Sequence, residues 1–357
     1  MKILVTGGAG FIGSNLVEAL LKRSDIELVR VLDNLATGHL HNLQEFMELP
    51  NFEFMEGDIR NLDDCLKACD GIDAVSHQAA LGSVPRSIAD PITSHNVNVN
   101  GFLNMLEAVR AKGIKRFVYA SSSSVYGDLN ESPKVEMRVG KVLSPYAATK
   151  MTNELYAEAY AKNYNLTIAG FRYFNVFGPK QDPNGPYAAV IPLFVKSALT
   201  NVPPTINGDG SITRDFTPVA NVVNINMLAL TGSLEGGKHY VFNVACGNTT
   251  DLLSIWKMVR DIAGSAVEAV HGPVRPGDIL FSLADVGYAK EVLGYEPITD
   301  LRAGLQGVVE WMGAQRASWR PGGLFTAAPV YISWFTPFGL FTALPVYAVR
   351  FKRMSIV

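Results

Sequence analysis

Three glycines near the N-terminus constrain the fold of this chain more than any other feature. The segment KILVTGGAGFIGSNLVEALLKR runs from a short apolar stretch through Gly7, Gly10 and Gly13 into an amphipathic helical pattern. A second apolar stretch, ELVRVLD, ends in Asp33, twenty residues after Gly13. This spacing of strand, glycine turn, helix and acid predicts a dinucleotide site, because the helix N-terminus presents N–H groups to a pyrophosphate.

The acid at the end of the second strand predicts NAD rather than NADP as the cofactor. Asp33 can accept hydrogen bonds from both hydroxyls of the adenosine ribose, and its charge would repel a 2′-phosphate. The alternative interpretation is a structural glycine turn beside a surface aspartate, which the strand–turn–helix context disfavours.

Apolar runs and helical patterns alternate after this first unit. Runs in NFEFMEGDI, GIDAVSHQAA, IKRFVYASSSSVYG and LTIAGFRYFNVFG are separated by helical patterns such as NVNGFLNMLEAVRAKG and MTNELYAEAYAKNY. This alternation predicts an α/β fold with a Rossmann-type, doubly wound parallel sheet. Ligands of such sheets bind beyond the carboxyl ends of the strands. The polar residues expected at those ends are Asp33, Asp58, His77, Ser122 and Asn175.

Composition and charge limit the partners and the cellular compartment that we expect for this protein. The chain has 357 residues, of which 48% are hydrophobic, so it can bury a substantial core. A net charge of −2 offers no basic field, so nucleic acid is not an expected partner. The start MKILVTGG lacks a signal-peptide pattern, and three cysteines do not make a disulfide framework. We therefore expect a cytoplasmic protein.

A tyrosine and a lysine stand four residues apart in SPYAATK, residues 144–150. On a helix, this spacing puts Tyr146 and Lys150 on one face. The preceding strand ends in a run of serines, residues 121–124. Near a cationic nicotinamide and an ammonium group the pKa of a tyrosine falls, so Tyr146 can take a proton from a substrate hydroxyl near neutral pH.

The cysteines and histidines do not form a metal-binding pattern. Cys65 and Cys69 lie four residues apart, but no second pair follows at zinc spacing, so helix packing is the better interpretation. The six histidines are scattered, and we expect no metal. His77 is interpreted as a neutral packed residue rather than a general base, because Tyr146 already suits that role.

The chain resembles the extended short-chain dehydrogenase/reductase family, in its branch of nucleotide-sugar epimerases and dehydratases. The resemblance rests on TGGAGFIGS, GDI, HQAA, NVNG, SSSSVYG, YAATK and RYFNVFGP, in this order over residues 1–180. It implies a catalytic triad of Ser122, Tyr146 and Lys150, with Ser123 as the alternative to Ser122 because the serine run is degenerate. A non-catalytic NAD-binding regulator is the alternative from another class, and the intact triad counts against it.

The resemblance implies two sets of binding residues. The cofactor set is Gly7, Gly10, Phe11, Ile12, Gly13, Asp33, Asn34, Asp58, Ile59, Gln78, Ala79, Ala80, Asn98, Tyr146, Lys150 and Tyr173. The substrate set is Gly82, Ser83, Ser122, Asn175, Ala189, Val190, Asn207, Arg214, Arg275, Asp278 and Ser282. Within it, Arg214 and Arg275 would bind a diphosphate together with Asn175, and Asp278 would bind the uridine ribose.

Residues 77–312 are similar to bacterial UDP-N-acetylglucosamine 4-epimerases, which supply N-acetylgalactosamine for surface polysaccharides. The similar segments are HQAALGSVPRSIADPI, FRYFNVFGPKQDPNGPYAAVIP, INGDGSITRDFTPVANVV and RPGDILFSLAD. Dehydratases of the family carry Asp-Glu where this chain has Ser123 and Ser124, and a reductase would need NADPH, which Asp33 disfavours. The similarity therefore implies reversible C4 epimerisation of a UDP-sugar through a 4-keto intermediate, with NAD held throughout.

One residue bears on the size of the sugar. Ser282 stands where epimerases restricted to non-acetylated hexoses carry a bulky tyrosine. A serine leaves room for an N-acetyl group, and Ser83 could hydrogen-bond the sugar, so UDP-N-acetylglucosamine is the expected substrate. The alternatives are a UDP-glucose/UDP-galactose 4-epimerase and a Ser282 that serves only as a small packing residue.

The motifs divide the chain into three parts. We expect an NAD-binding Rossmann domain over residues 1–175, with strand and helix returns from later segments, and a smaller mixed α/β UDP-sugar-binding region over 176–313. Residues 314–357 form an apolar tail that repeats GLFTAAPVY as GLFTALPVY. Its length permits membrane contact, but its prolines favour packing or an idle extension. By resemblance, the helices around 98–112 and 148–163 imply a homodimer.

Overall fold

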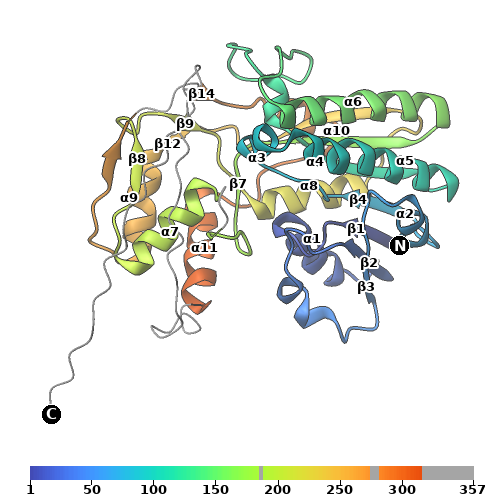
Figure 1. The fold of residues 1–357 in the computed structure, drawn as a ribbon, viewed down its shortest axis with the longest axis horizontal. Coiled ribbons are helices and arrows are strands. Elements are labelled where there is room, and N and C mark those ends of the chain that lie inside the picture. The colour runs from blue at the N-terminus through green and yellow to red at the C-terminus, as the bar shows by residue number, and fades with distance from the viewer. Residues whose placement is uncertain (185–187, 274–280, 316–357) are drawn as a thin grey trace, which may run out of the picture. The chain divides into compact units, whose positions relative to one another are not determined.

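The structure is a computed structural model that describes residues 1–184, 188–273 and 281–315. The described residues belong to one compact unit, Met1–Ala317. Figure 1 shows a parallel sheet flanked by helices and a smaller group of short strands and helices. No helix in the described ranges is long and apolar enough to cross a membrane. Most of the predicted apolar tail lies outside these ranges.

The central sheet has the predicted doubly wound topology. In the described part of the chain it has seven parallel strands in the order β11-β6-β5-β4-β1-β2-β3. The strands are β1 (Lys2–Thr6), β2 (Leu28–Asp33), β3 (Phe52–Glu56), β4 (Ala74–His77), β5 (Arg116–Ser122), β6 (Thr167–Tyr173) and β11 (His239–Val244). The strand order reverses between β1 and β4, so the ligand crevice is expected at the carboxyl ends of these two strands.

Helices cover both faces of the sheet because successive strand residues point to opposite sides. Ile3 and Val5 pack in the core on one face, and Leu4 packs in the core on the other. The first face carries α1 (Phe11–Leu21), α8 (Val219–Thr231) and α10 (Gly287–Leu293). The second face carries α2 (Leu62–Ala68), α5 (Gly101–Ala111) and α6 (Pro145–Tyr164). Cys65 and Cys69 are fully buried in the second core, which confirms helix packing.

Later segments of the chain complete the sheet. The strand β11 pairs with β6, with His239 opposite Ile168, and α8 packs against α1 on the first face. A strand and helices that follow residue 176 in sequence therefore belong to the Rossmann-type layer.

A smaller group of elements follows β6. Its short strands are β7 (Val176–Phe177), β8 (Thr205–Asn207), β9 (Thr213–Arg214), β10 (Thr217–Pro218), β12 (Thr250–Asp251), β13 (Val270–Gly272) and β14 (Phe281–Ser282). Its helices are α7 (Val190–Thr200), α9 (Leu252–Ala263) and α11 (Leu301–Gln315). The helices α7 and α9 meet through the rings of Phe194 and Trp256, whose centroids are 5.5 Å apart.

Short helices connect the strands near their carboxyl ends. They are the 3₁₀ helices Leu40–Asn42, Gln44–Phe46 and Ser123–Tyr126, the α-helices α3 (Val84–Ala89) and α4 (Pro91–His95), and the π-helix Asn96–Asn100. The π-helix runs directly into α5, so the predicted helical pattern NVNGFLNMLEAVRAKG is helical as a whole except for its last residues.

Candidate active site

The loop between β1 and α1 has close backbone packing that only glycine permits. Gly7 has a φ of +69°, and a Cβ there would lie 2.7 Å from the Ala79 Cα. A Cβ on Gly13 would lie 2.1 Å from the Gly7 carbonyl oxygen. Gly10 precedes α1 and provides no side-chain cap, so the first N–H groups of the helix face outward without a side-chain partner from the cap. The loop is thus a backbone cradle for an anion.

Asp33 stands at the carboxyl end of β2 and is buried beside this loop. One carboxylate oxygen accepts a hydrogen bond from the Ala9 N–H at 2.9 Å, and the other accepts one from the Leu35 N–H at 2.8 Å. Burial raises the pKa of Asp33, and the two N–H donors oppose this effect. Each oxygen keeps a second lone pair, so the carboxylate can still accept from a ribose hydroxyl.

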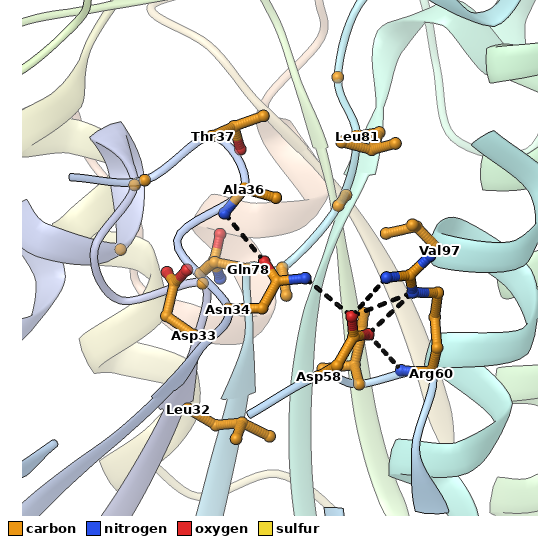
Figure 2. Close-up of a pocket in the computed structure, with 18 of the residues that line it drawn as sticks. Leu32, Asp33, Asn34, Ala36, Thr37, Asp58, Arg60, Gln78, Leu81 and Val97 are labelled. Carbon is orange, nitrogen blue, oxygen red and sulfur yellow. Dashed lines mark hydrogen bonds and ion pairs between the residues drawn. The ribbon is translucent and has the colours of Figure 1, made fainter. Parts of the chain in front are cut away.

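A cavity of 420 Å³ opens in front of the glycine loop (Figure 2). The predicted binding residues that line it are Gly7, Gly10, Phe11, Ile12, Gly13, Asp33, Asn34, Asp58, Ile59, Gln78, Ala79, Ala80 and Gly82. Sequence patterns did not indicate Leu32, Ala36, Thr37, Gly38, Gly57, Arg60, Leu81, Thr93 and Val97, which also line it. Most of these residues are direct sequence neighbours of predicted binding residues. This neighbourhood was the signal that could have identified them as lining the cavity.

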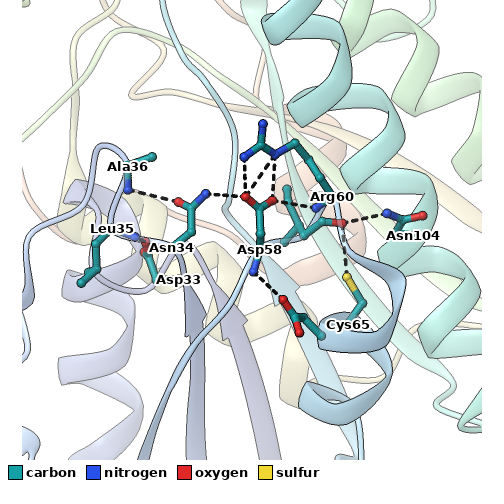
Figure 3. A network of polar contacts seen from close by, with 10 residues as sticks. Asp33, Asn34, Leu35, Ala36, Asp58, Arg60, Cys65 and Asn104 are labelled. Carbon is teal, nitrogen blue, oxygen red and sulfur yellow. Dashed lines mark hydrogen bonds and ion pairs between the residues drawn. The ribbon is translucent and has the colours of Figure 1, made fainter.

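Asp58 is the centre of a polar network at this cavity (Figure 3). Its carboxylate accepts hydrogen bonds from Asn34 Nδ2 at 2.9 Å and from Arg60 Nη2 at 2.6 Å. Asn34 Oδ1 accepts from the Ala36 N–H at 3.1 Å, which fixes the amide between the ends of β2 and β3. The Arg60 hydrogen bond is the main cause that lowers the pKa of Asp58 to about 2, so the carboxylate remains a hydrogen-bond acceptor at neutral pH.

Two residues of the predicted cofactor set brace the cavity wall. The Tyr173 hydroxyl donates to Gln78 Oε1 at 3.1 Å and accepts from Asn226 Nδ2 at 2.9 Å. Asn98 accepts from the Leu81 N–H at 2.8 Å and donates to the Leu81 carbonyl at 3.1 Å. Gln78 and Leu81 both line the cavity, so these contacts hold its wall in place. Asn226 comes from α8, and no local motif pointed to it.

His77 at the end of β4 is a packed, neutral residue, as the sequence predicts. Its ring is 3% exposed and lies 5.6 Å from the Phe102 ring and 5.8 Å from the Phe117 ring. Its Nδ1 lies 2.8 Å from Thr6 Oγ1. Burial, helped by the charge of Lys150, lowers the pKa of His77 to about 3. The imidazole is therefore uncharged at neutral pH.

The predicted proton-handling residues meet where β5 ends and α6 begins. Ser122 is the last residue of β5, and its side chain lies close enough to the Tyr146 side chain to oppose the effect of burial on the pKa of Tyr146. The Lys150 ammonium nitrogen lies 6.0 Å from the centre of the Tyr146 ring and donates to the Ala120 carbonyl at 2.8 Å. Ser123 opens the following 3₁₀ helix. The contact with Tyr146 therefore favours Ser122 over Ser123 as the serine of the set.

The protein's own groups do not produce the lowered tyrosine pKa that the sequence predicts. Burial raises the pKa of Tyr146, and the Ser122 side chain opposes this. Burial also lowers the pKa of Lys150 to about 8. A lowered pKa at Tyr146 therefore depends on the positive charge of a nicotinamide ring in addition to the Lys150 ammonium.

Two residues of the predicted substrate set have left-handed backbone conformations. Ser83 has a φ of +96°, and its Oγ accepts a hydrogen bond from the Arg86 N–H at 3.3 Å. Asn175 has a φ of +37°, and its Nδ2 donates to the Asp215 carbonyl at 3.0 Å. Non-glycine residues rarely adopt such conformations, which cluster at ligand-binding sites when the surrounding structure enforces them.

Ser282 and Arg214 are direct neighbours. They lie opposite each other in the parallel pairing of β14 with β9. The Arg214 guanidinium donates to the Thr213 carbonyl at 2.9 Å. The residue predicted to set the sugar size is therefore adjacent to one predicted to bind the diphosphate.

The remaining members of the predicted substrate set are more scattered. Ala189 precedes α7 without a side-chain cap, and Val190 is the first residue of that helix. Asn207 ends β8. Arg275 and Asp278 lie outside the described residues.

The donor set of the cavity fits NAD. A cradle that a Cβ would fill, a helix N-terminus and a buried carboxylate at the end of β2 are the three parts of a dinucleotide site. The glycine loop would hold the pyrophosphate, Asp33 the adenosine ribose, and Gln78 to Ala80 would line the same cavity. Within the described ranges, no group of three or more His, Cys, Asp or Glu side chains could hold a metal ion.

Comparison with known proteins agrees with NAD as the cofactor. The model of the NAD dependent epimerase/dehydratase family matches residues 3–245. A UDP-glucose 4-epimerase of Mycolicibacterium smegmatis is 38% identical over 313 residues, which is 87% of this chain and 98% of that protein.

Two solved structures are similar over the same extent. One is a UDP-N-acetylglucosamine 4-epimerase of Methanobrevibacter ruminantium in complex with UDP-N-acetylmuramic acid, with a TM-score of 0.82, 36% identity, and coverage of 88% of this chain and 98% of that chain. The other is the UDP-glucose 4-epimerase of Thermus thermophilus in complex with NAD, with a TM-score of 0.78, 36% identity, and coverage of 88% and 99%.

Proposed function

The chain belongs to the NAD-dependent epimerase/dehydratase family, and we propose that it interconverts UDP-N-acetylglucosamine and UDP-N-acetylgalactosamine. NAD is its cofactor, and the three relatives described above are UDP-sugar 4-epimerases. The observation that carries the proposal is the meeting of Ser122, Tyr146 and Lys150 at the end of β5, the strand next to β4. The residues directly after β4 line the NAD cavity, and a small residue, Ser282, lies opposite Arg214 in the predicted substrate set.

The chain's own residues handle the proton of the reaction. Tyr146 takes the proton from the sugar O4 hydroxyl and later returns it, and the Ser122 hydroxyl holds that oxygen in place. The Lys150 ammonium favours the phenolate form of Tyr146. The glycine loop and Asp33 would hold NAD, which would supply the hydride acceptor for C4 and the donor for its opposite face, so the overall reaction has no net redox change.

The residues after Ser122 support epimerisation over dehydration. Elimination of water needs an acid at this place, whereas the chain has Ser123 and Ser124. Ser124 donates its N–H to Ser122 Oγ at 3.2 Å and its hydroxyl to the same oxygen at 3.0 Å. These contacts orient Ser122 and supply no carboxylic acid.

The choice of an acetylated sugar depends on Ser282. A serine side chain beside Arg214 leaves space that a tyrosine ring would fill. The test is Ser282→Tyr, with turnover measured separately on UDP-N-acetylglucosamine and UDP-glucose. We expect the variant to lose the acetylated activity by about tenfold or more and to keep the UDP-glucose activity, because steric exclusion acts only on the larger group.

Equal loss on both sugars in the Ser282→Tyr variant would contradict the role given to Ser282. The second candidate is then a UDP-glucose/UDP-galactose 4-epimerase, which the Mycolicibacterium smegmatis relative favours by its name. A wild-type enzyme that turns over UDP-glucose alone would establish that candidate.

We also propose that the protein is a homodimer. The helix α6 packs with α3 and α4, and these helices expose Leu155 by 66%, Ile88 by 63% and Ile92 by 73%. Large exposed apolar side chains are typical of an interface when they form one patch, and we propose that these three form such a patch. In light scattering, Leu155→Arg should be a monomer. The control Leu193→Arg, at an exposed leucine of α7, should remain a dimer. A monomeric wild-type protein would refute the proposal.

A further inference from the structure

The face of α6 that carries Tyr146 and Lys150 also carries a third ionisable residue, Glu154. Glu154 follows Lys150 by four residues, as Lys150 follows Tyr146, so the three side chains lie on one face of the helix. A lysine and a glutamate at this spacing commonly form an ion pair. Among the described ion pairs, Glu154 is joined to Arg172 instead, and the Lys150 ammonium donates to the Ala120 carbonyl.

Arg172 and Ser121 hold the Glu154 carboxylate from the sheet side. Arg172 Nε donates to Glu154 Oε1 at 3.0 Å, and Nη2 donates to Oε2 at 2.7 Å. The Ser121 hydroxyl donates to Oε1 at 2.6 Å. The side chains of the ion pair are only 5% and 7% exposed. Ser121 immediately precedes Ser122. Through Ser121, the ion pair of Glu154 and Arg172 therefore connects the end of β5 to α6 and β6.

The guanidinium itself is held from its other side. Arg172 Nη1 donates to the Glu136 carbonyl at 2.9 Å, and its central carbon lies 4.9 Å from the centre of the Tyr126 ring. Burial disfavours its charge, but the Glu154 carboxylate outweighs burial and raises the pKa of Arg172. Arg172 is therefore a fixed cation that cannot leave Glu154 without losing several partners.

We propose that Arg172 is a positioning residue that keeps the Glu154 carboxylate away from Lys150. Without the guanidinium, Glu154 would be a buried carboxylate with one partner lost, and Lys150 stands one helical turn before it on the same buried face of α6. Pairing with Glu154 would draw the ammonium from Tyr146 and neutralise its charge there. The inference rests on the proposed function, because it takes Lys150 as the lysine of the catalytic set.

The first test is direct and independent of any sugar. The holoenzyme is labelled with ¹³C at lysine Cε, and the pKa of Lys150 is followed by NMR, with Lys150→Met to identify its signal. The Lys150 ammonium lies near the Tyr146 ring of α6 and donates to the Ala120 carbonyl of β5, and its charge acts on the neutral His77 of β4. Glu154 shares the buried face of α6 one turn further on. We expect a pKa of about 8 in the wild type. In Arg172→Gln the pKa of Lys150 should rise by about 1 pH unit or more, because the Glu154 carboxylate would then stabilise the ammonium.

The double variant Glu154→Gln/Arg172→Gln separates this role from a purely structural one. It removes both buried charges and can keep hydrogen bonds to Ser121, so it is expected to fold even where Arg172→Gln does not. Its Lys150 pKa should match the wild type, and its kcat should exceed that of Arg172→Gln by about tenfold or more. Arg110→Gln is the matched control, because Arg110 pairs with Glu107 on the surface.

The outcomes distinguish the two proposals. An unchanged Lys150 pKa in folded Arg172→Gln would overturn the inference, because Glu154 would then have become protonated rather than captured Lys150. A folded double variant with wild-type NAD content, a wild-type Lys150 pKa and the turnover of Arg172→Gln would also overturn it. A wild-type enzyme without epimerase activity would refute the proposed function, while the Lys150 titration would still decide the inference.

Discussion

Substituting Gly13 by alanine should damage the NAD cradle. Gly13 lies inside α1, where alanine is favoured over glycine by about 1 kcal/mol. The added Cβ, however, would lie 2.1 Å from the Gly7 carbonyl oxygen and 2.8 Å from the Gly8 Cα. Both are backbone atoms, so the loop must shift by roughly 1 Å, and overpacking of this kind costs about 1–3 kcal/mol.

Gly307→Ala is the matched control for this prediction. Gly307 lies inside α11, and a Cβ there meets no atom within 4 Å, so only the favourable helix propensity remains. The difference in the free energy of unfolding between the two variants should therefore be about 1–3 kcal/mol, measured by urea unfolding. Gly13→Ala should also weaken NAD binding by about tenfold or more, or about 1.4 kcal/mol. Wild-type NAD content, with a stability equal to that of Gly307→Ala, would refute the close-packing argument.

Three further predictions follow from the same site. Tyr146→Phe should lower turnover by about a hundredfold or more and leave NAD bound. Tyr164→Phe, at the exposed C-terminal end of the same helix, should keep the turnover of the wild type; sugar assays and nucleotide content measure both variants. Lowering the pH from 7 to 5 should reduce the free energy of unfolding by about 2 kcal/mol through His77. The folded pKa of His77, about 3, lies below the unfolded value, so the unfolded chain binds the proton first. In urea unfolding, His77→Gln should not show this decrease. Asp33→Asn should lower NAD affinity and raise NADP affinity in binding titrations, and an unchanged preference would count against the ribose role.

The sheet was predictable because each strand carries its own local signal. A parallel strand that is buried on both faces appears as a continuous apolar run, as Ile3 to Val5 do at 0% exposure. The glycine loop was equally predictable, since its constraints lie within a few residues of one another. The position of Asp33 follows from the same local unit.

The contacts that shape the site depend on residues that are far apart in sequence. Gln78 bonds to Asn226 across 148 residues, and Glu154 of α6 bonds to Arg172 of β6. No spacing rule joins such residues, because their proximity is created by the order of the strands. The effect of burial on Tyr146 was unpredictable for a related reason: sequence patterns do not quantify burial, which raises the pKa of Tyr146 in the protein without NAD.

The most direct test of the account is the turnover of sugars by the purified protein without added NAD. UDP-N-acetylglucosamine and UDP-glucose are supplied separately, and the C4 epimers are quantified by chromatography. We expect UDP-N-acetylgalactosamine to form, with NAD retained in the protein throughout. Failure to epimerise either sugar, even after NAD is supplied, would contradict it.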